Sequence, residues 1–287
     1  PRHIPTPTAA RGQKGTPMLN ELYHSLNPIA FTLGPLQVHW YALAYLAGFV
    51  LAGVVVYRVA RRWGLDLSAE DVTNVVVGIA WGIIIGARLF YVVFYGDGYY
   101  LANPIKVFAL GEGGMSFHGG LVGALVGGAT MCRVCGISIA SFCDLGVIGA
   151  PLGLFFGRCA NFVNGELWGK PTDLPWGVVF ETGGNVARHP SQLYEAVLEG
   201  LVIFAVLLWM SRRRPARPQG TFMGTFLVLY GVFRFLIEFV RLPDAQLGYL
   251  FGPITMGQLL SLPLIVAGIV VLAYARRTQR PQVGHVE

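Results

Sequence analysis

Seven stretches of the chain are each long and apolar enough to cross a lipid bilayer, and this feature restricts the possible folds more than any other. They lie near residues 39–60, 72–94, 117–134, 142–160, 192–210, 221–240 and 254–275. A helix that crosses the hydrocarbon core needs roughly 20 mostly apolar residues. These stretches are continuously apolar, whereas a membrane strand alternates apolar and polar residues. The sequence therefore predicts an all-α integral membrane protein with about seven transmembrane helices.

The composition excludes several other classes of protein. Hydrophobic residues make up 54% of the chain and charged residues 13%, against about 25% charged in a typical soluble domain. A disordered chain, a fibrous chain and a nucleic-acid-binding domain do not fit these values. Cys132 and Cys135 form a C-x-x-C pair, but no second pair or nearby histidine completes a zinc site. We therefore expect no metal and no nucleic-acid partner.

The positions of the arginines predict the orientation in the membrane. Arginines follow the first, third, fifth and seventh stretches, at Arg58, Arg61, Arg62, Arg133, Arg212, Arg213, Arg214, Arg217, Arg276, Arg277 and Arg280. With seven crossings these residues all fall on one side, and the excess of basic residues marks that side as cytoplasmic. The N-terminus is then outside and the C-terminus is cytoplasmic.

The domain organisation follows from the same pattern. We expect residues 1–27 to form a disordered tail and residues 276–287 a basic cytoplasmic tail. Residues 28–275 should form a single seven-helix transmembrane domain, with an outward-facing loop near 161–190.

Charged residues inside the apolar stretches point to a site. Arg88, Arg158, Arg234 and Glu238 all lie at or near membrane depth. A charge at the bilayer centre costs at least ~2.5–3.5 kcal/mol, so such residues usually pair with one another or line a wet cavity. For Arg88, snorkelling or a structural pair explains the residue as well as a function does.

Four polar residues of the sixth stretch share one helix face. Tyr230, Arg234, Glu238 and Arg241 recur at spacings of four, four and three, which places them on the same side of a helix. One interpretation is an Arg–Glu pair that joins two helices. The interpretation that we favour is a polar stripe that lines a site for a charged headgroup.

A second polar segment follows the fourth stretch. Arg158, Asn161, Asn164 and Glu166 lie within nine residues of one another. Gly165 and Gly169 suggest that the backbone leaves the helix there and turns tightly. We interpret the segment as an anion site in which the arginine is held by the glutamate. The alternative is a polar cap at a helix end.

His118 is a candidate base at the outer end of the third stretch. Gly119 and Gly120 follow it, and two glycines leave backbone N–H groups bare and allow a ligand to approach closely. A neutral imidazole near pH 7 suits proton abstraction. The alternative is a structural role, which a single histidine at a helix end more often has.

The motifs resemble those of a known family. Residues Gly157–Gly169 fit the pattern Gly-Arg-x-x-Asn-Phe-x-Asn-x-Glu-x-x-Gly without a gap, and residues 118–121 read His-Gly-Gly-Leu. The segments 39–41, 188–195, 230–241 and 243–246 also match. Over residues 28–275 the chain resembles the bacterial prolipoprotein diacylglyceryl transferases.

The resemblance implies a reaction and a location. Members of this family are multi-pass enzymes of the bacterial inner membrane, with the N-terminus outside and the C-terminus inside. The donor is phosphatidylglycerol, and the acceptor is the thiol of the lipobox cysteine in the signal peptide of a preprolipoprotein. The products are a thioether-linked diacylglyceryl group and glycerol 1-phosphate, in the first step of lipoprotein maturation. The resemblance implies no cofactor.

The candidate site residues fit that chemistry. His118 would take the proton of the thiol, because the thiolate is the nucleophile. Arg158 and Arg234 would present two-pronged donor faces to the phosphate, held in place by Glu166 and Glu238. Tyr41, Asn161 and Tyr230 would supply neutral hydrogen bonds, and Gly169 would permit the turn of the loop. The remaining candidates for substrate binding are Asn164, Arg241, Gly119 and Gly120.

Two other classes of protein remain as alternatives. A membrane lipid or anion transporter would also need intramembrane arginines, but it would more often show an internal repeat, and the sequence has none that we detect. A scaffold or receptor would not need the four charged residues together, namely Arg158, Glu166, Arg234 and Glu238.

Overall fold

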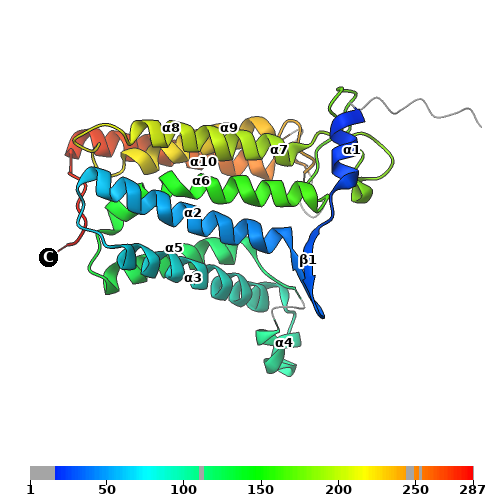
Figure 1. The fold of residues 1–287 in the computed structure, drawn as a ribbon, viewed down its shortest axis with the longest axis horizontal. Helices are drawn as coiled ribbons and strands as arrows, with labels where there is room; N and C mark the ends of the chain where they lie inside the picture. The colour runs from blue at the N-terminus through cyan, green and yellow to red at the C-terminus, as the bar shows by residue number, and fades with distance from the viewer. Residues whose placement is uncertain (1–16, 110–112, 244–248, 252–253, 287) are drawn as a thin grey trace, which may run out of the picture. The chain divides into compact units, whose positions relative to one another are not determined.

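Helices dominate the computed structural model, which describes residues 17–109, 113–243, 249–251 and 254–286 (Figure 1). The elements in chain order are α1 (Pro17–Ser25), β1 (Ile29–Leu33), β2 (Leu36–His39), α2 (Trp40–Trp63), α3 (Ala69–Tyr95), α4 (Tyr99–Ala102), the 3₁₀-helix η1 (Pro104–Phe108), α5 (Phe117–Val134), α6 (Ile139–Val163), the 3₁₀-helix η3 (Glu181–Gly183), α7 (Ser191–Glu195), the π-helix η4 (Ala196–Val202), α8 (Ile203–Met210), α9 (Thr221–Ile237), β3 (Tyr249–Phe251), β4 (Ile254–Thr255) and α10 (Met256–Thr278). The strands form two short antiparallel pairs, β1 with β2 and β3 with β4.

Five helices of the described residues are long and apolar enough to cross a membrane. They are Trp40–Trp63, Ala69–Tyr95, Ile139–Val163, Ser191–Met210 (which comprises α7, η4 and α8) and Met256–Thr278. Helix α9 is apolar but shorter, and α5 has 18 residues, of which five are glycines. The expected all-α membrane protein is therefore confirmed, while the count of seven crossings and the orientation stay predictions.

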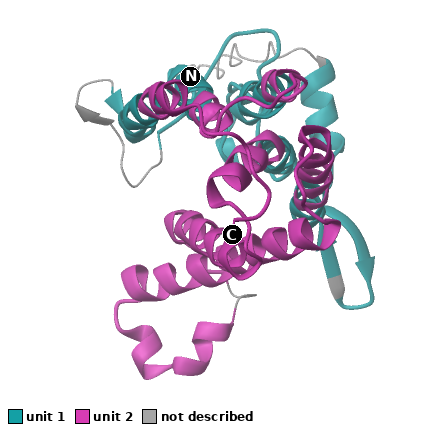
Figure 2. Ribbon diagram, turned by 90° about the vertical axis from the view of Figure 1, so that its left-hand side faces the viewer, with its two compact units in different colours: residues 1–48, 151–205, 227–267 teal, residues 49–150, 206–226, 268–287 magenta. Residues whose placement is uncertain are grey.

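The chain divides into two compact units, which Figure 2 distinguishes by colour. Unit 1 comprises residues 1–48, 151–205 and 227–267. Unit 2 comprises residues 49–150, 206–226 and 268–287. Most of the polar candidates fall in unit 1, whereas Arg88, His118, Gly119 and Gly120 fall in unit 2.

Unit 1 has a small aromatic core that includes part of the expected N-terminal tail. Tyr23 of α1 is buried against Phe162 and Phe180, with ring centroids 5.6 and 4.9 Å away. The side chain of Asn20 accepts a hydrogen bond from the backbone N–H of Val179 (2.9 Å). Residues 17–25, which the sequence led us to expect to be disordered, are therefore helical, because the apolar side of α1 packs on the loop that follows α6.

In unit 2, glycines lie between α3 and α5, which run side by side (Figure 1). A Cβ atom added at Gly86 would lie 2.8 Å from the Cα of Gly123, and one added at Gly82 would lie 3.2 Å from the Cα of Gly127. Real Cβ atoms essentially never approach as closely as 2.8 Å. The two backbones are therefore in direct contact, the usual role of small residues between membrane helices.

The segment after α10 is also ordered and packs on unit 2. The side-chain amide of Gln282 donates to Asp144 (2.6 Å), and the backbone N–H of Ser138 donates to the carbonyl of Gly284 (2.9 Å). The carboxylate of Asp144 also accepts from the backbone N–H groups of Gly220 and Met223, both at 2.8 Å. One buried carboxylate thus joins the start of α9 to the C-terminal segment.

Candidate functional site

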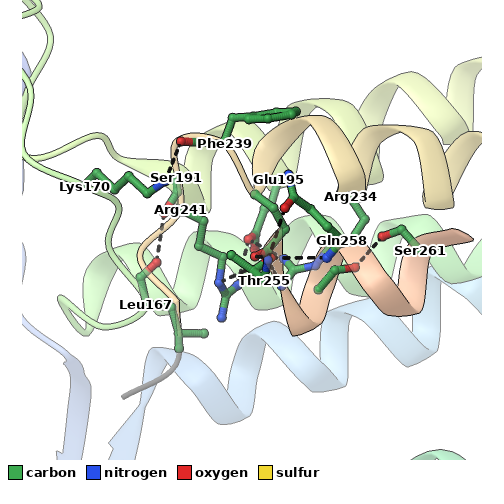
Figure 3. A network of polar contacts seen from close by, with 12 residues as sticks. Leu167, Lys170, Ser191, Glu195, Arg234, Phe239, Arg241, Thr255, Gln258 and Ser261 are labelled. Atoms are coloured by element: carbon green, nitrogen blue, oxygen red, sulfur yellow. Dashed lines mark hydrogen bonds and ion pairs between the residues drawn. The ribbon is translucent and has the colours of Figure 1, made fainter. Parts of the chain in front are cut away.

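A buried cluster of arginines and glutamates forms the candidate site in unit 1 (Figure 3). Its charged members are Arg158 of α6, Glu195 and Glu199 of the helix that runs from Ser191, and Arg234, Glu238 and Arg241 of α9 and the turn after it. Most of these side chains are nearly inaccessible: Glu195 and Glu199 are 0% exposed and Glu238 is 3% exposed. Charges so deeply buried are stable only when they are paired and hydrogen-bonded.

Glu195 is the centre of the cluster. One carboxylate oxygen, Oε1, accepts hydrogen bonds from Arg234 Nη1 (2.9 Å) and Arg241 Nη1 (2.8 Å). The other oxygen, Oε2, lies 2.5 Å from Arg158 Nε. One carboxylate therefore fixes three guanidinium groups that come from distant parts of the chain.

Glu238 forms the second centre. Its Oε1 lies 2.5 Å from Arg234 Nη2 and 3.9 Å from Arg241 Nε. Its Oε2 accepts a hydrogen bond from the hydroxyl of Thr255 (2.6 Å), the last residue of β4. Gly257 leaves the space that this carboxylate needs, since a Cβ there would lie 2.9 Å from Glu238 Cγ. Arg234 is thus held between two glutamates.

The charged residues Arg234, Glu238 and Arg241 lie on one side of α9 and the turn after it, as their spacing predicted; Arg234 pairs with Glu195 of another helix, and a headgroup site along this stripe stays a prediction. Helix α9 ends at Ile237, but the backbone N–H of Glu238 still donates to Arg234 O (3.2 Å) and that of Arg241 to Ile237 O (3.0 Å). This additional turn keeps the three charged side chains on one side. Tyr230 interacts electrostatically with Arg234 and Glu195, which places it near these charged side chains.

Glu166 does not hold Arg158, and this prediction is wrong. The carboxylate of Glu166 instead accepts hydrogen bonds from the side-chain amides of Asn161 (2.8 Å) and Asn164 (3.3 Å). The chain turns at Gly165, which has a φ of +66°, and this turn carries Glu166 to an exposed position past the end of α6. Arg158, one turn before Asn161, pairs with the buried Glu195 instead.

Tyr41 lies beside the hydrogen-bonded group formed by Asn161, Asn164 and Glu166. It interacts with Asn161, and its hydroxyl lies 3.2 Å from the hydroxyl of Tyr45. The expected neutral hydrogen-bonding residues Tyr41 and Asn161 are therefore brought together, with Asn164 beside them through Glu166.

Gly169 is required for close packing rather than for the turn. Positive φ angles occur at Gly165 and at Leu167 (+59°), but not at Gly169. A Cβ at Gly169 would lie 2.6 Å from the carbonyl oxygen of Val240 and 2.8 Å from the Cβ of His189. The loop runs between these two segments and forms an isolated bridge to Arg241. Gly169 thus lets the loop reach the backbone of a cluster residue.

His189 contacts Tyr194 and the backbone of the loop at Gly169. Its Nδ1 lies 3.2 Å from the hydroxyl of Tyr194, and its backbone carbonyl accepts from the N–H of Gly169 (2.9 Å). Burial, and to a lesser extent the charge of Lys170, lowers the pKa of His189. The imidazole is therefore biased toward the neutral form.

His118 is exposed at the N-terminal end of α5 in unit 2. The backbone N–H of Gly119 donates to the hydroxyl of Ser116 (3.4 Å) and that of Gly120 to the carbonyl of Ser116 (2.9 Å). A Cβ at Gly119 would lie 2.8 Å from Cγ of Phe90 in α3. The two N–H groups expected to be bare are therefore used by the helix cap, and Gly119 permits contact with α3. The prediction that Gly119 and Gly120 leave bare N–H groups for a ligand is therefore wrong.

Arg88 anchors the loop that leads to His118. Its guanidinium is buried and donates to the carbonyl oxygens of Val107 (2.7 Å), Lys106 (2.5 Å), Gly113 (2.6 Å) and Gly114 (3.0 Å). The contacts of Arg88 therefore agree with a structural role rather than with a role in the candidate site. The sequence could not show this, because the partners are backbone carbonyls.

Three residues of the cluster were not predicted from the sequence, namely Glu195, Glu199 and Thr255. A signal existed for the two glutamates, because both fall inside the apolar stretch 192–210 and are spaced by four. No comparable signal marked Thr255. The matched residues Asp244–Gln246 lie outside the described residues.

The arrangement suits the binding of a phosphate. Among the described residues, Arg158 is engaged only through Nε, and its side chain is 18% exposed. Its two terminal nitrogens are thus available as a fork for a planar or tetrahedral anion. Arg234 and Arg241, held by Glu195, lie on the other side of the same carboxylate.

Comparison with known proteins places the chain in one family. The family model described as "Prolipoprotein diacylglyceryl transferase" matches residues 28–274. A phosphatidylglycerol–prolipoprotein diacylglyceryl transferase of Geobacter sulfurreducens is 50% identical over 252 residues, covering 88% of this chain and 96% of the relative. Proteins of the same name from Methylococcus capsulatus and Pseudomonas aeruginosa are 49% and 44% identical, covering 89% and 91% of this chain and 98% and 97% of the relatives.

Proposed function

This chain belongs to the prolipoprotein diacylglyceryl transferase family, and we propose that it transfers the diacylglyceryl group of phosphatidylglycerol to the lipobox cysteine of a preprolipoprotein. The thiolate sulfur attacks the glyceryl carbon, and the bond between that carbon and the phosphate oxygen breaks. The products are a thioether and glycerol 1-phosphate. The observation that supports this function most directly is the buried three-arginine cluster within an otherwise apolar helical protein.

The arginines are proposed to bind the phosphate and stabilise the leaving group. Negative charge develops on the phosphate oxygen as the carbon–oxygen bond breaks. Preorganised cations at the position of developing charge are usually the largest single contribution to catalysis. Arg158 has the open fork, so we propose that it contacts the phosphate first, with Arg234 beside it. Glu195 and Glu238 keep the guanidinium groups in place.

The neutral residues and the base complete the proposed site. Tyr41, Asn161, Asn164 and Tyr230 would donate hydrogen bonds to the headgroup, with Glu166 orienting the two amides. His118, which has an exposed imidazole, would take the proton of the acceptor thiol. The thiol proton thus moves to the imidazole, while the electron pair of the broken bond stays on the phosphate.

Incubation of the purified protein with phosphatidylglycerol and a lipobox peptide tests this function. The expected products are the thioether-modified peptide and glycerol 1-phosphate, detected by mass spectrometry. Movement of lipid between leaflets without chemical change would instead identify a transporter. Binding without either outcome would indicate a scaffold, and a peptide with serine in place of the cysteine is the control.

The seven-crossing topology can be tested by labelling of single cysteines. We expect residues near 61 and 213 to face the cytoplasm, and residues near 175 and 246 to face outward, because the arginines gather on one side. In intact cells, an impermeant thiol reagent should label position 175 and not position 213. The reverse pattern would show that the orientation is inverted.

Arg234 and Glu238 are expected to differ in their effect on turnover. Glu238→Gln loosens one of the two carboxylates that hold Arg234, but Glu195 remains. Arg234→Ala removes a charge from the phosphate and also takes from Glu238 the guanidinium nitrogen that lies 2.5 Å from its carboxylate. Loss of one partner of a buried pair lowers the free energy of unfolding by about 3–5 kcal/mol. Steady-state kinetics should therefore show a larger loss for Arg234→Ala. An equal or larger loss for Glu238→Gln would mean that Glu238 itself takes part in the chemistry.

A further inference from the structure

Glu199 is a buried carboxyl group that the proposed mechanism does not use. It lies in the π-helix η4, four residues after Glu195, and is 0% exposed. Neither of its carboxyl oxygens has a hydrogen-bond partner among the residues that the structure describes. Glu195 and Glu238, by contrast, each have a carboxylate oxygen within 2.9 Å of a guanidinium nitrogen, although Glu195 Oε2 also lacks a hydrogen-bond partner among the described residues. Short π-helical segments occur frequently at functional sites.

The surroundings of Glu199 are rich in charge. The charged and titratable groups that face it are Glu195 on its own helix, Arg158 on α6, and Tyr230, Arg234 and Arg241 on α9 and the turn after it. The forks of Arg234 are already directed at Glu195 and Glu238. Glu199 therefore lies beside the arginines without receiving a hydrogen bond from them.

An ionised carboxylate in this position would be poorly stabilised. Removing a carboxylate from water without hydrogen bonds is so unfavourable that such a group usually takes up a proton instead. The protonation state of Glu199 also decides the charge of the cluster. Ionisation of Glu199 would add one negative charge beside the three guanidinium groups, so the cluster is one unit more positive when Glu199 is neutral than when it is ionised.

We propose that Glu199 holds its proton at neutral pH and thereby keeps the arginine cluster more positive by one unit of charge, which favours the binding of a phosphodiester headgroup. The identity of that headgroup as phosphatidylglycerol rests on the proposed function. Glu199 is then a positioning residue that sets the anion affinity of Arg158 and Arg234 without touching the substrate. When it loses its proton in alkaline solution, the net charge of the cluster falls by one unit and the affinity for the headgroup falls.

Infrared spectroscopy tests the protonation directly. The carbonyl stretch of a protonated carboxylic acid should be present in the wild-type protein at neutral pH and should decrease in Glu199→Gln. Glu238→Gln is the matched control, because Glu238 lies 2.5 Å from a guanidinium nitrogen of the same cluster, and it should leave that absorption unchanged. An absorption that is insensitive to Glu199→Gln would overturn the proposal.

Lipid binding without chemistry tests the consequence. The probe is short-chain phosphatidylglycerol in detergent micelles, titrated calorimetrically, with phosphatidylcholine of the same chain length as the control for headgroup charge. Wild-type affinity should fall roughly tenfold or more between neutral and alkaline pH, because loss of one net charge near the phosphate weakens an attraction that the protein only partly screens. Glu199→Gln should lose most of this pH dependence.

The same pH dependence in both proteins would contradict the proposal, even if phosphatidylglycerol binds. Absence of transfer to a lipobox peptide would contradict the proposed function, whereas this binding measurement does not require transfer. If Glu199→Gln fails to fold, the wild-type protein still decides the question. The carbonyl stretch of its protonated carboxylic acid and its affinity for phosphatidylglycerol should then decrease over the same pH range. A decrease over two separate pH ranges would overturn the proposal.

Discussion

Replacing His118 by glutamine should lower turnover by roughly 10²–10⁴-fold, the usual contribution of a general base. Phosphatidylglycerol should still bind, because the arginine cluster lies in a different unit and its contacts do not involve His118. The remaining rate should rise with pH, since more of the acceptor thiol ionises unaided as the pH approaches its free pKa of about 8.5. Turnover, lipid affinity and the pH profile of this one variant are the required measurements.

Two other roles for His118 give different results in the same measurements. If the residue is structural, the variant will express poorly or lose lipid binding together with activity. If His118 only hydrogen-bonds the headgroup, the apparent KM for the lipid will rise with little change in kcat. Turnover near that of the wild-type protein at neutral pH would exclude His118 as the base.

The parts of the site that the sequence predicted correctly are those joined by local geometry. Arg234, Glu238 and Arg241 are three or four residues apart, so a helix alone brings their side chains together. Asn161, Asn164 and Glu166 are close in sequence and do form one hydrogen-bonded group. The helical membrane fold follows from the length of the apolar stretches in the same way.

The parts that the sequence did not predict depend on how helices are rotated against one another. Glu195 contacts Arg158 and Arg234, which are 37 and 39 residues away along the chain, and no local period encodes that contact. The assignment of Glu166 to Arg158 was wrong for the same reason, because proximity in sequence was taken for proximity in space. Gly119 was assigned to a ligand, although its lack of a side chain serves contact with α3.

The largest loss of stability is expected for Glu195. Glu195→Gln keeps the size of the side chain but removes the negative charge that three arginines share. Loss of one partner of a buried ion pair lowers the free energy of unfolding by about 3–5 kcal/mol. Turnover should fall by roughly 10²–10³-fold, the effect of losing one preorganised donor, because the arginines that stabilise the leaving group are no longer held in position. Thermal unfolding in detergent and the transfer assay measure the two effects.

Glu166→Gln is the matched control, since it makes the same chemical change in the residue first expected to hold Arg158. Glu166 is exposed and accepts from two amides only, so its replacement should change stability by about 0.5–1.5 kcal/mol. Glu195→Asp provides a second control, because it restores the charge on a shorter side chain and should recover part of the lost stability. Equal effects of Glu166→Gln and Glu195→Gln would contradict the central role of Glu195. No recovery in Glu195→Asp would show that the length of the side chain, rather than its charge, organises the three arginines.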